Sequence, residues 1–409
     1  MKIPLYKRPS DFFGIIFTEI RESFTDANTV LLFVVAVILY PMLYSIGYIN
    51  QTIKDIPVAV IDQDHTSFSR QYTRMLDATE QLSVSYKPGN LKEARQLFYD
   101  GKIHGILIIP ENFEKEILSR RQADVPVYCD AGKFFVYKQV FTASTYATST
   151  LNAGVEIKSL LSQGHSWEDA MNRFEGLNAQ FFDLYNPSSG YCNFIVPGIL
   201  IIVIQQSLLI GIGLLFGKRK ELGQFLPPAK EKTTWWDSFA PVIGKAIAYV
   251  TIYLATTLVT LVLLYHWLSF PERGSFWLVY LMLIPFLFTV SFMGITLSSL
   301  FTKRVHSLIF LVFLSPIVFF LTGVAWPLES LPPMLKVLSY IFPTTPMVPA
   351  FIKLRLIGGG LGSVSREFTV IMIQMTVYFV LAVVSYSLSV RTVWRASLTR
   401  DLSPNGARL

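Results

Sequence analysis

Charged residues are scarce in this sequence of 409 residues. Asp, Glu, Lys and Arg make up 15% of the chain, whereas 52% is hydrophobic; a soluble domain usually carries about 25% charged residues. Six runs have no charged residue at all: Val30–Ile49, Tyr191–Gly217, Ala246–Phe270, Ser275–Thr302, Ser307–Leu328 and Phe368–Val390. Each run can cross a bilayer, which takes roughly 20 helical residues. Because backbone polar groups in a bilayer must pair internally, the runs predict six transmembrane helices and exclude a soluble protein.

Motifs for nucleotide binding and catalysis are also missing. The stretch Gly211–Lys218 resembles a phosphate-binding loop, but its glycines are one residue too far apart and Arg219 stands where Ser or Thr is needed. There is no G-x-S-x-G elbow, so a hydrolase is unsupported. The runs contain no Asp, Glu, Lys or Arg, which argues against a proton or ion relay. The chain is therefore predicted to be no enzyme and to hold no cofactor, and any ATP chemistry must come from another chain.

Cysteine and metal-ligand patterns are sparse. The only two cysteines are Cys129 and Cys192, which either pair in an oxidising compartment or remain free. The sequence Asp62-Gln-Asp64-His65 has metal-ligand spacing, but a turn with local backbone hydrogen bonds is the favoured reading, because no second ligand cluster accompanies it. We therefore predict no metal site.

The basic residues define an orientation. Lys and Arg gather in residues 1–28, in the loop 218–245, at Lys303-Arg304 and in the tail after residue 390. The loops on the opposite side, 267–274 and 326–367, contain fewer. The positive-inside rule then predicts that both termini are cytoplasmic. The net charge of +7 follows mostly from this topology, so no nucleic-acid partner is expected.

The sequence divides into five parts. Residues 1–28 contain a predicted amphipathic interfacial helix, with Phe12, Phe13, Ile16, Phe17, Ile20 and Phe24 at helical spacing and Glu19, Arg21 and Glu22 on its surface. Residues 29–49 form span 1, residues 191–390 contain spans 2–6, and residues 391–409 form a cytoplasmic tail.

Residues 50–190 are predicted to lie outside. Strands at 56–62, 82–86, 105–110 and 125–131 alternate there with helices at 67–78, 91–101 and 111–121. This alternation predicts an external α/β domain, completed by long helices from Phe134 and Trp167.

Two further features of the membrane part contain candidate functional residues. Gln205 and Gln206 lie within span 2, where buried amides either hold helices together or face a cargo path; helix packing is the favoured reading. The loop 218–245 contains Trp235-Trp236, which either anchor a linker at the headgroups or form part of a docking surface for a cytoplasmic partner.

Four stretches together resemble one family. They are "IPVAVIDQDHTSFSR" (56–70), "GKIHGILIIPENFEKEI" (101–117), "YNPSSGYCNFIVPGIL" (185–200) and "LTGVAWPLESLPPMLKVLSYIFPTTP" (321–346). The chain is similar to permease subunits of the type-2 ATP-binding-cassette (ABC) exporters, in the branch with a large external domain after the first span. The resemblance covers nearly the whole chain.

The last of these stretches is rich in prolines, among them Pro327, Pro332 and Pro343. The resemblance implies short re-entrant helices between spans 5 and 6, with the prolines ending each helix and Trp326 at the interface. A plain surface loop is the alternative, but it does not explain an apolar helical face formed by Leu331, Met334, Leu335, Leu338 and Ile341.

The resemblance implies the function of an exporter subunit in the bacterial inner membrane. A second copy or a paralogue would complete a path for an amphipathic or hydrophobic cargo, such as a drug or lipid-like molecule. A separate ATPase subunit would bind ATP and Mg²⁺, and a periplasmic adaptor is a further candidate partner. The alternative is a membrane-anchored surface receptor, or a protein like the phage-infection proteins, without transport activity.

The resemblance also places the contact with the ATPase in the loop after span 2. The family usually has Glu-x-Gly-Thr there, followed by a short apolar helix. Here Glu221-Leu222-Gly223 is followed by Gln224, and Pro227-Pro228 interrupts the helix. The expected coupling residues are therefore Glu221, Gly223, Trp235 and Trp236, with the docking helix shorter or shifted towards 233–239.

Overall fold

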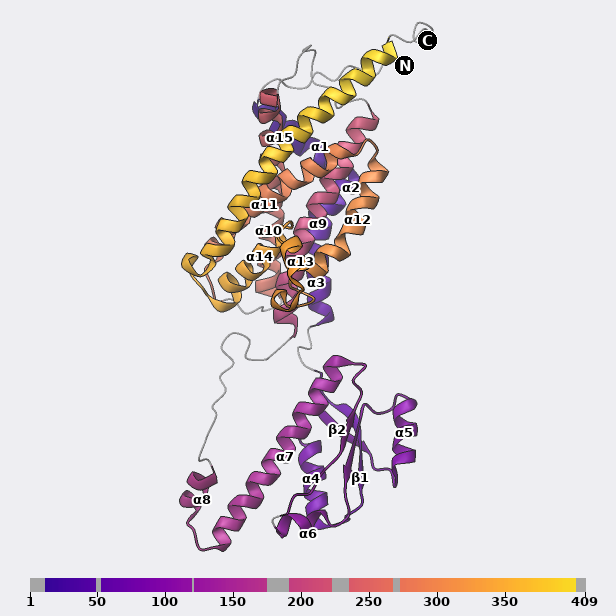
Figure 1. Cartoon of the computed structure of the whole chain (residues 1–409), viewed down its shortest axis with the longest axis vertical. Helices are drawn as coiled ribbons and strands as arrows, with labels where there is room; N and C mark the ends of the chain where they lie inside the picture. The colour runs from indigo at the N-terminus through magenta and orange to yellow at the C-terminus, as the bar shows by residue number, and fades with distance from the viewer. Residues whose placement is uncertain are drawn as a thin grey trace. The chain divides into compact units, whose positions relative to one another are not determined.

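The computed structural model describes residues 12–48, 53–119, 121–174, 191–222, 235–267 and 273–401. The chain forms two compact units (Figure 1). One, the α/β unit, is Thr52–Phe182; the other, the membrane unit, combines Met1–Gln51 with Asp183–Leu409.

A four-stranded sheet in the order β2-β1-β3-β4 organises the α/β unit. Strands β1 (Ile56–Asp62), β2 (Leu82–Tyr86) and β3 (Gly105–Ile109) are parallel, and β4 (Val127–Cys129) runs antiparallel at the edge. Each parallel strand is followed by a helix: α4 (Ser67–Asp77), α5 (Leu91–Tyr99) and α6 (Phe113–Leu118). A parallel connection needs such a crossover, so the predicted alternation gives this topology.

Helices cover both faces of the sheet (Figure 1). On one face, Ala59 and Ile61 of β1 pack with Ala94 of α5. On the other face, Val58 and Val60 pack with residues of α4, α6 and the long helix α7 (Phe134–Ser162). Helix α8 (Trp167–Phe174) follows α7 and contacts it. Strand β1 is buried on both sides, which explains its continuous apolar sequence.

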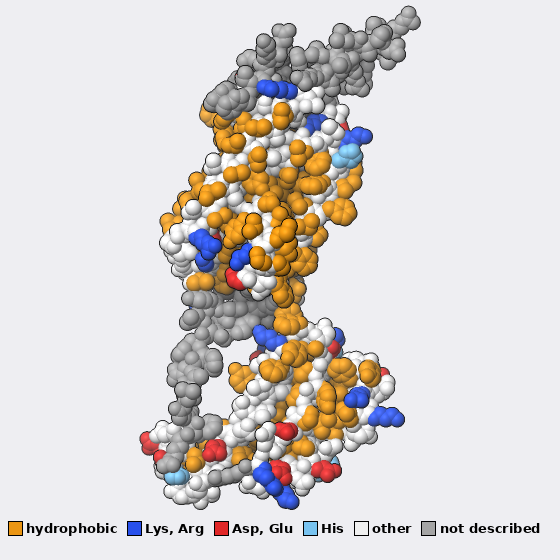
Figure 2. Space-filling view, viewed as in Figure 1, with side chains coloured by type: hydrophobic (Ala, Val, Ile, Leu, Met, Phe, Trp, Pro, Cys, Tyr) orange, Lys and Arg blue, Asp and Glu red, His pale blue; other side chains and the backbone are white. Residues whose placement is uncertain are grey.

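Among the described residues, the membrane unit has six helices long and apolar enough to cross a bilayer, as the six runs predict. The first, Ala27–Gly47, consists of α2 (Ala27–Val30), a π-helical stretch (Leu31–Ala36) and α3 (Val37–Gly47). The other five are α9 (Tyr191–Glu221), α10 (Phe239–Val262, continued to Trp267), α11 (Phe276–Leu300), α12 (Arg304–Leu321) and α15 (Ser365–Asp401, preceded by a 3-10 turn from Leu361). Helix α1 (Phe12–Thr25) precedes the first. Hydrophobic side chains spread over the visible face of this unit (Figure 2). The chain is thus a multi-pass membrane protein.

Helix α9 lies at the centre of the membrane unit and contacts α3, α11 and α12. Its glycines allow these close contacts: a Cβ on Gly217 would lie 2.5 Å from the Cα of Arg304, and one on Gly211 would lie 2.1 Å from the Phe33 ring. The glycine spacing that resembles a phosphate loop therefore serves helix packing.

Between α12 and α15 the backbone folds into two short helices. Helix α13 (Pro333–Ser339) and helix α14 (Thr344–Ile352, extended to Ile357) meet at a bend of 85°. The expectation that prolines end the short helices is wrong, because Pro332 and Pro343 stand at the N-caps of α13 and α14, and Pro327 at that of the 3-10 turn Leu328–Ser330. Proline suits the start of a helix, where its missing N–H removes no helical hydrogen bond.

Candidate functional site

Helix α1 turns its acidic side towards the protein. Glu19 is only 2% exposed, whereas Phe13 and Phe17 are 81% and 70% exposed. The expectation that Glu19 lies on the surface is therefore wrong. The physical reason is that cationic side chains at the ends of α9 and α10 pair with this carboxylate. An outward apolar face suits a helix at a membrane interface.

Three side chains surround the Glu19 carboxylate. Arg219 Nη2 of α9 lies 2.9 Å from Glu19 Oε1. Lys245 Nζ of α10 forms an ion pair with Oε2, and the Tyr249 hydroxyl, one turn further along α10, donates a hydrogen bond to Oε1. Lys245 and Arg219 are themselves nearly fully buried. A buried ion pair of this kind is costly to break, because removing one partner leaves an uncompensated charge.

The charges around Glu19 keep it ionised. Burial by itself raises the pKa of this carboxyl, but the positive charges of Arg219 and Lys245, with the hydrogen bonds from Lys245 and Tyr249, outweigh it. The pKa of Glu19 therefore lies well below its ordinary value of 4.5. Glu22, one turn along α1, also binds Arg219: its Oε2 accepts from Nε at 2.8 Å and from Nη2 at 2.6 Å.

Asp26 extends these contacts to the first and fifth spans. Its Oδ1 accepts a hydrogen bond from Thr29 N at 3.1 Å, which caps α2. Its Oδ2 lies 2.6 Å from Lys218 Nζ, and its Oδ1 lies 3.5 Å from Arg304 Nη2 at the start of α12. We call Glu19, Glu22, Asp26, Lys218, Arg219 and Lys245 the charge cluster. It joins one end of α1, α2, α9 and α10.

One of the expected coupling residues, Glu221, lies next to this cluster. Glu221, in the last turn of α9, accepts a hydrogen bond from Arg304 N at 2.9 Å. Trp235 and Trp236 form the start of a 3-10 turn, Trp235–Ser238, that contacts α10 and α15. The positions of their side chains, and Gly223 as a whole, lie outside the described residues.

Helices α9 and α10, the two that flank this loop, also supply the cations of the cluster. The ion pairs of Arg219 and Lys245 with Glu19 therefore connect both of these helices to α1.

The cluster was not expected from the sequence, because Lys218, Arg219 and Lys245 counted as loop residues. Helices α9 and α10 extend past the apolar runs and include them. A signal was present: Glu19, Glu22 and Asp26 are spaced by three and four residues, which places them on one side of a helix.

A second polar group lies at the bend between α13 and α14. The Gln374 amide of α15 donates to the Tyr340 carbonyl at 2.6 Å, and the Tyr378 hydroxyl donates to that of Ile341 at 2.7 Å. Gln205 of α9 also binds this bend, through Thr344 N. The neighbouring Gln206 is buried, and its amide atoms have no hydrogen-bond partner among the described residues.

The remaining candidates have local structural roles. Asp62 Oδ1 accepts from the backbone N of Asp64 and His65, at 3.1 and 3.0 Å, so this motif forms a turn. Within the described residues, no group of three or more His, Cys, Asp and Glu side chains is arranged to hold a metal ion. Cys129 and Cys192 are both free thiols.

Comparison with known proteins agrees with this architecture. The family model described as ABC-2 family transporter protein matches residues 28–384. The probable multidrug ABC transporter permease YbhS of Escherichia coli (strain K12) is 23% identical over 347 residues, which cover 83% of this chain and 87% of YbhS. The probable multidrug ABC transporter permease YbhR of the same strain is 23% identical over 327 residues, covering 79% and 83%. A match over most of its length, on a fold with six candidate spans, shows that the chain belongs to the ABC-2 family of transporter proteins.

Proposed function

We propose that this chain is the permease subunit of an ATP-driven exporter for amphipathic or hydrophobic small molecules. Family membership supports a transport subunit whose ATPase is a separate chain. The similarity to YbhS and YbhR, which are described as probable multidrug ABC transporter permeases, supports a drug-like cargo. ATP and Mg²⁺ would bind to the partner ATPase rather than to this chain.

The observation that carries the proposal is the charge cluster beside the loop 222–234. An ATPase that docks on this loop acts on α9 and α10, and the buried pairs of Arg219 and Lys245 with Glu19 carry the motion to α1. Glu221 adds a link to α12 through Arg304 N. A surface receptor needs no such connection between a cytoplasmic loop and several helices, so the exporter is favoured over that alternative.

The same reasoning supports an orientation in the bacterial inner membrane. The loop 222–234, both termini and the charge cluster would be cytoplasmic, where an ATPase and ATP are available. The α/β unit would then lie on the periplasmic side, and α13 and α14 would form a re-entrant element at that side. A periplasmic adaptor is a further proposed partner of the α/β unit.

A second permease subunit, identical or paralogous, would complete the translocation path. Outward-facing apolar side chains on α12, among them Phe313 and Phe320, leave room for such a contact or for lipid. Gln206 would meet the cargo only after the helices around it separate, because its amide is buried and has no hydrogen-bond partner among the described residues.

ATP hydrolysis tests the proposal. The purified chain should hydrolyse no ATP above the level of contaminants, whereas the complex that co-purifies with it from native cells should hydrolyse ATP and drive efflux in proteoliposomes. Hydrolysis by the isolated chain, or a complex without ATPase activity, would contradict the proposal.

A further inference from the structure

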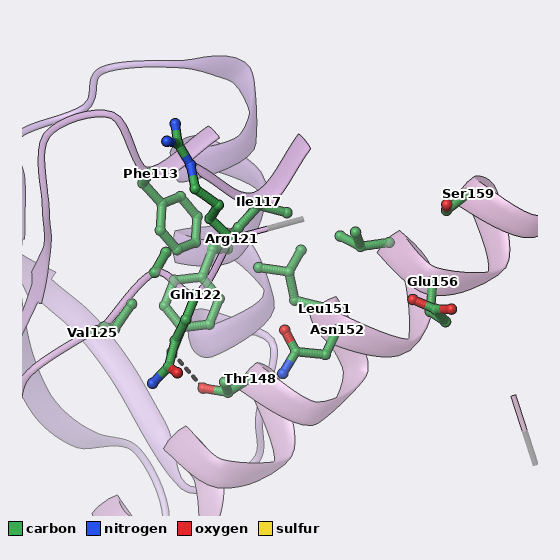
Figure 3. Close-up of a pocket in the computed structure, with 13 residues that line it drawn as sticks. Phe113, Ile117, Arg121, Gln122, Val125, Thr148, Leu151, Asn152, Glu156 and Ser159 are labelled. Carbon is green, nitrogen blue, oxygen red and sulfur yellow. Dashed lines mark hydrogen bonds between the residues drawn. The ribbon is translucent and has the colours of Figure 1, made fainter. Parts of the chain in front are cut away.

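A cavity of about 370 Å³ lies in the α/β unit, between α7 and the segment that leads into β4 (Figure 3). Tyr72, Phe113 and Leu151 form its base and are themselves almost fully buried. Gln122, Asn152 and Glu156 lie at its exposed rim. Small-molecule sites are typically concave, apolar at the base, and about 300 to 1,000 Å³ in volume. The size and lining of this cavity fit that description.

The polar atoms at the base accept hydrogen bonds. The Thr148 hydroxyl donates to the Ser144 carbonyl at 2.7 Å, and this uses its only hydrogen. The Tyr72 hydroxyl, 2.8 Å from Thr148 Oγ1, must then donate to Thr148. Burial raises the pKa of Tyr72, which keeps it a neutral phenol. Its oxygen therefore retains lone pairs for a ligand that brings a donor.

The rim can both accept and donate. Gln122 Nε2 donates one of its two hydrogens to Asp124 at 2.8 Å, so this amide can still accept through its oxygen and donate through its second N–H. Arg121 Nε lies 2.7 Å from Glu116, so the positive charge of Arg121 is compensated. Glu156 has no ion-pair partner within the described part of the chain. The cavity thus combines aromatic rings with one carboxylate at its rim, that of Glu156.

A second cavity of about 450 Å³ adjoins the first, since Val125 and Thr148 line both. Tyr137 and Phe141 line it and stack with their ring centroids 6.1 Å apart. The buried Ser144 hydroxyl also lines it and has no hydrogen-bond partner among the described residues. A ligand longer than the first cavity can therefore continue over an aromatic surface.

From this geometry we infer that the α/β unit binds amphipathic organic cations in the cavity between α7 and residues 121–125. The cationic group pairs with Glu156, and its apolar groups pack on Tyr72 and Phe113, where aromatic faces also attract positive charge. This inference goes beyond the proposed function, because binding here requires neither ATP nor export.

The test uses the full chain in lipid nanodiscs, without an ATPase. Isothermal titration compares tetraphenylphosphonium with tetraphenylborate, which have nearly the same shape and opposite charge. We expect saturable binding of the cation and at least tenfold weaker binding of the anion. No saturable binding of the cation, or equal affinity for the two ions, would overturn the inference.

Variants locate the site. Glu156→Gln should weaken binding of the cation about three- to fivefold, the range of a partly exposed ion pair. Asn152→Trp, which places a ring from the exposed rim into the cavity, should weaken it at least tenfold.

The matched controls are Glu168→Gln, an exposed carboxylate on α8, and Thr150→Trp, an exposed position of α7 that does not line either cavity. Unchanged binding in both site variants, or equal losses in the controls, would contradict the assignment. Failure of ATP-driven export with binding intact would count against the proposed function alone.

Discussion

The side-chain oxygen of Gln205 on α9 accepts a hydrogen bond from the backbone N of Thr344, at 3.0 Å, inside the membrane unit. Thr344 is the first residue of α14, and the N–H groups at the start of a helix have no partner within it. An unpaired N–H is costly in an apolar environment. The side chain of Gln205, in a transmembrane helix, thus supplies the hydrogen-bond partner that the N–H of Thr344 lacks within α14.

Gln205→Leu should therefore destabilise the protein by about 1–3 kcal/mol, the cost of leaving a buried donor unpaired. The measurement is thermal unfolding of the purified chain in detergent. Gln206→Leu is the matched control, because its amide atoms are buried without a partner among the described residues. It should leave stability unchanged or raise it. Equal losses in the two variants would contradict this role of Gln205.

Glu19→Gln should be among the most destabilising single changes in the membrane unit. It removes the Glu19 carboxylate from the buried Lys245 and leaves Arg219 with Glu22 as its remaining ion-pair partner among the described residues, and breaking a buried pair typically costs about 3–5 kcal/mol. Thermal unfolding checks this as well. Glu22→Gln is the control, because the Glu22 side chain is 31% exposed and its pair with Arg219 is screened by water. A small effect of Glu19→Gln, no larger than that of Glu22→Gln, would show that the cluster does not anchor α1.

Gly217→Ala should loosen the packing of α9 against α12. The new methyl group would lie 2.5 Å from Arg304 Cα, and overpacking of this kind costs about 1–3 kcal/mol. Gly47→Ala adds the same methyl group where nothing lies within 4 Å and should change little. Melting temperatures of the two variants decide the matter. Wild-type stability of Gly217→Ala would mean that the two helices separate without cost.

The proposed orientation predicts opposite labelling of two positions. In a chain with both native cysteines replaced by serine, Lys92→Cys on the exposed side of α5 should react with an impermeant thiol reagent in intact cells. Lys230→Cys, in the loop after α9, should react only after permeabilisation. Equal labelling of both positions in intact cells would exclude the six-span topology.

Local patterns in the sequence were sufficient to predict the elements. The strands at Ile56–Asp62 and Leu82–Tyr86 lie where short apolar runs stand between amphipathic helices, and the six spans lie where charge is absent. Both signals depend on residues close together in the chain, which is why periodicity and hydropathy reveal them.

The polar contacts of the membrane unit could not be predicted in the same way. Glu19 and Lys245 are 226 residues apart, and Gln205 and Thr344 are 139 residues apart. The uncharged run of the third span begins at Ala246, so hydropathy assigned Lys245 to the loop before that span. A lysine at a helix end is buried only when a distant carboxylate compensates its charge, and the sequence does not state which carboxylate that is.

The central claim is that a separate ATPase acts through the loop between α9 and α10. The most direct measurement is recovery of the ATPase with the tagged double variant Trp235→Ala and Trp236→Ala, compared with Trp277→Ala, an exposed tryptophan on α11. Loss of a central aromatic anchor typically costs about 2 kcal/mol or more of binding. We predict that the double variant inserts normally, recovers far less ATPase and exports nothing, while the control behaves like wild type. Full ATPase recovery with normal export would contradict the claim and shift the contact to the helix Phe12–Thr25.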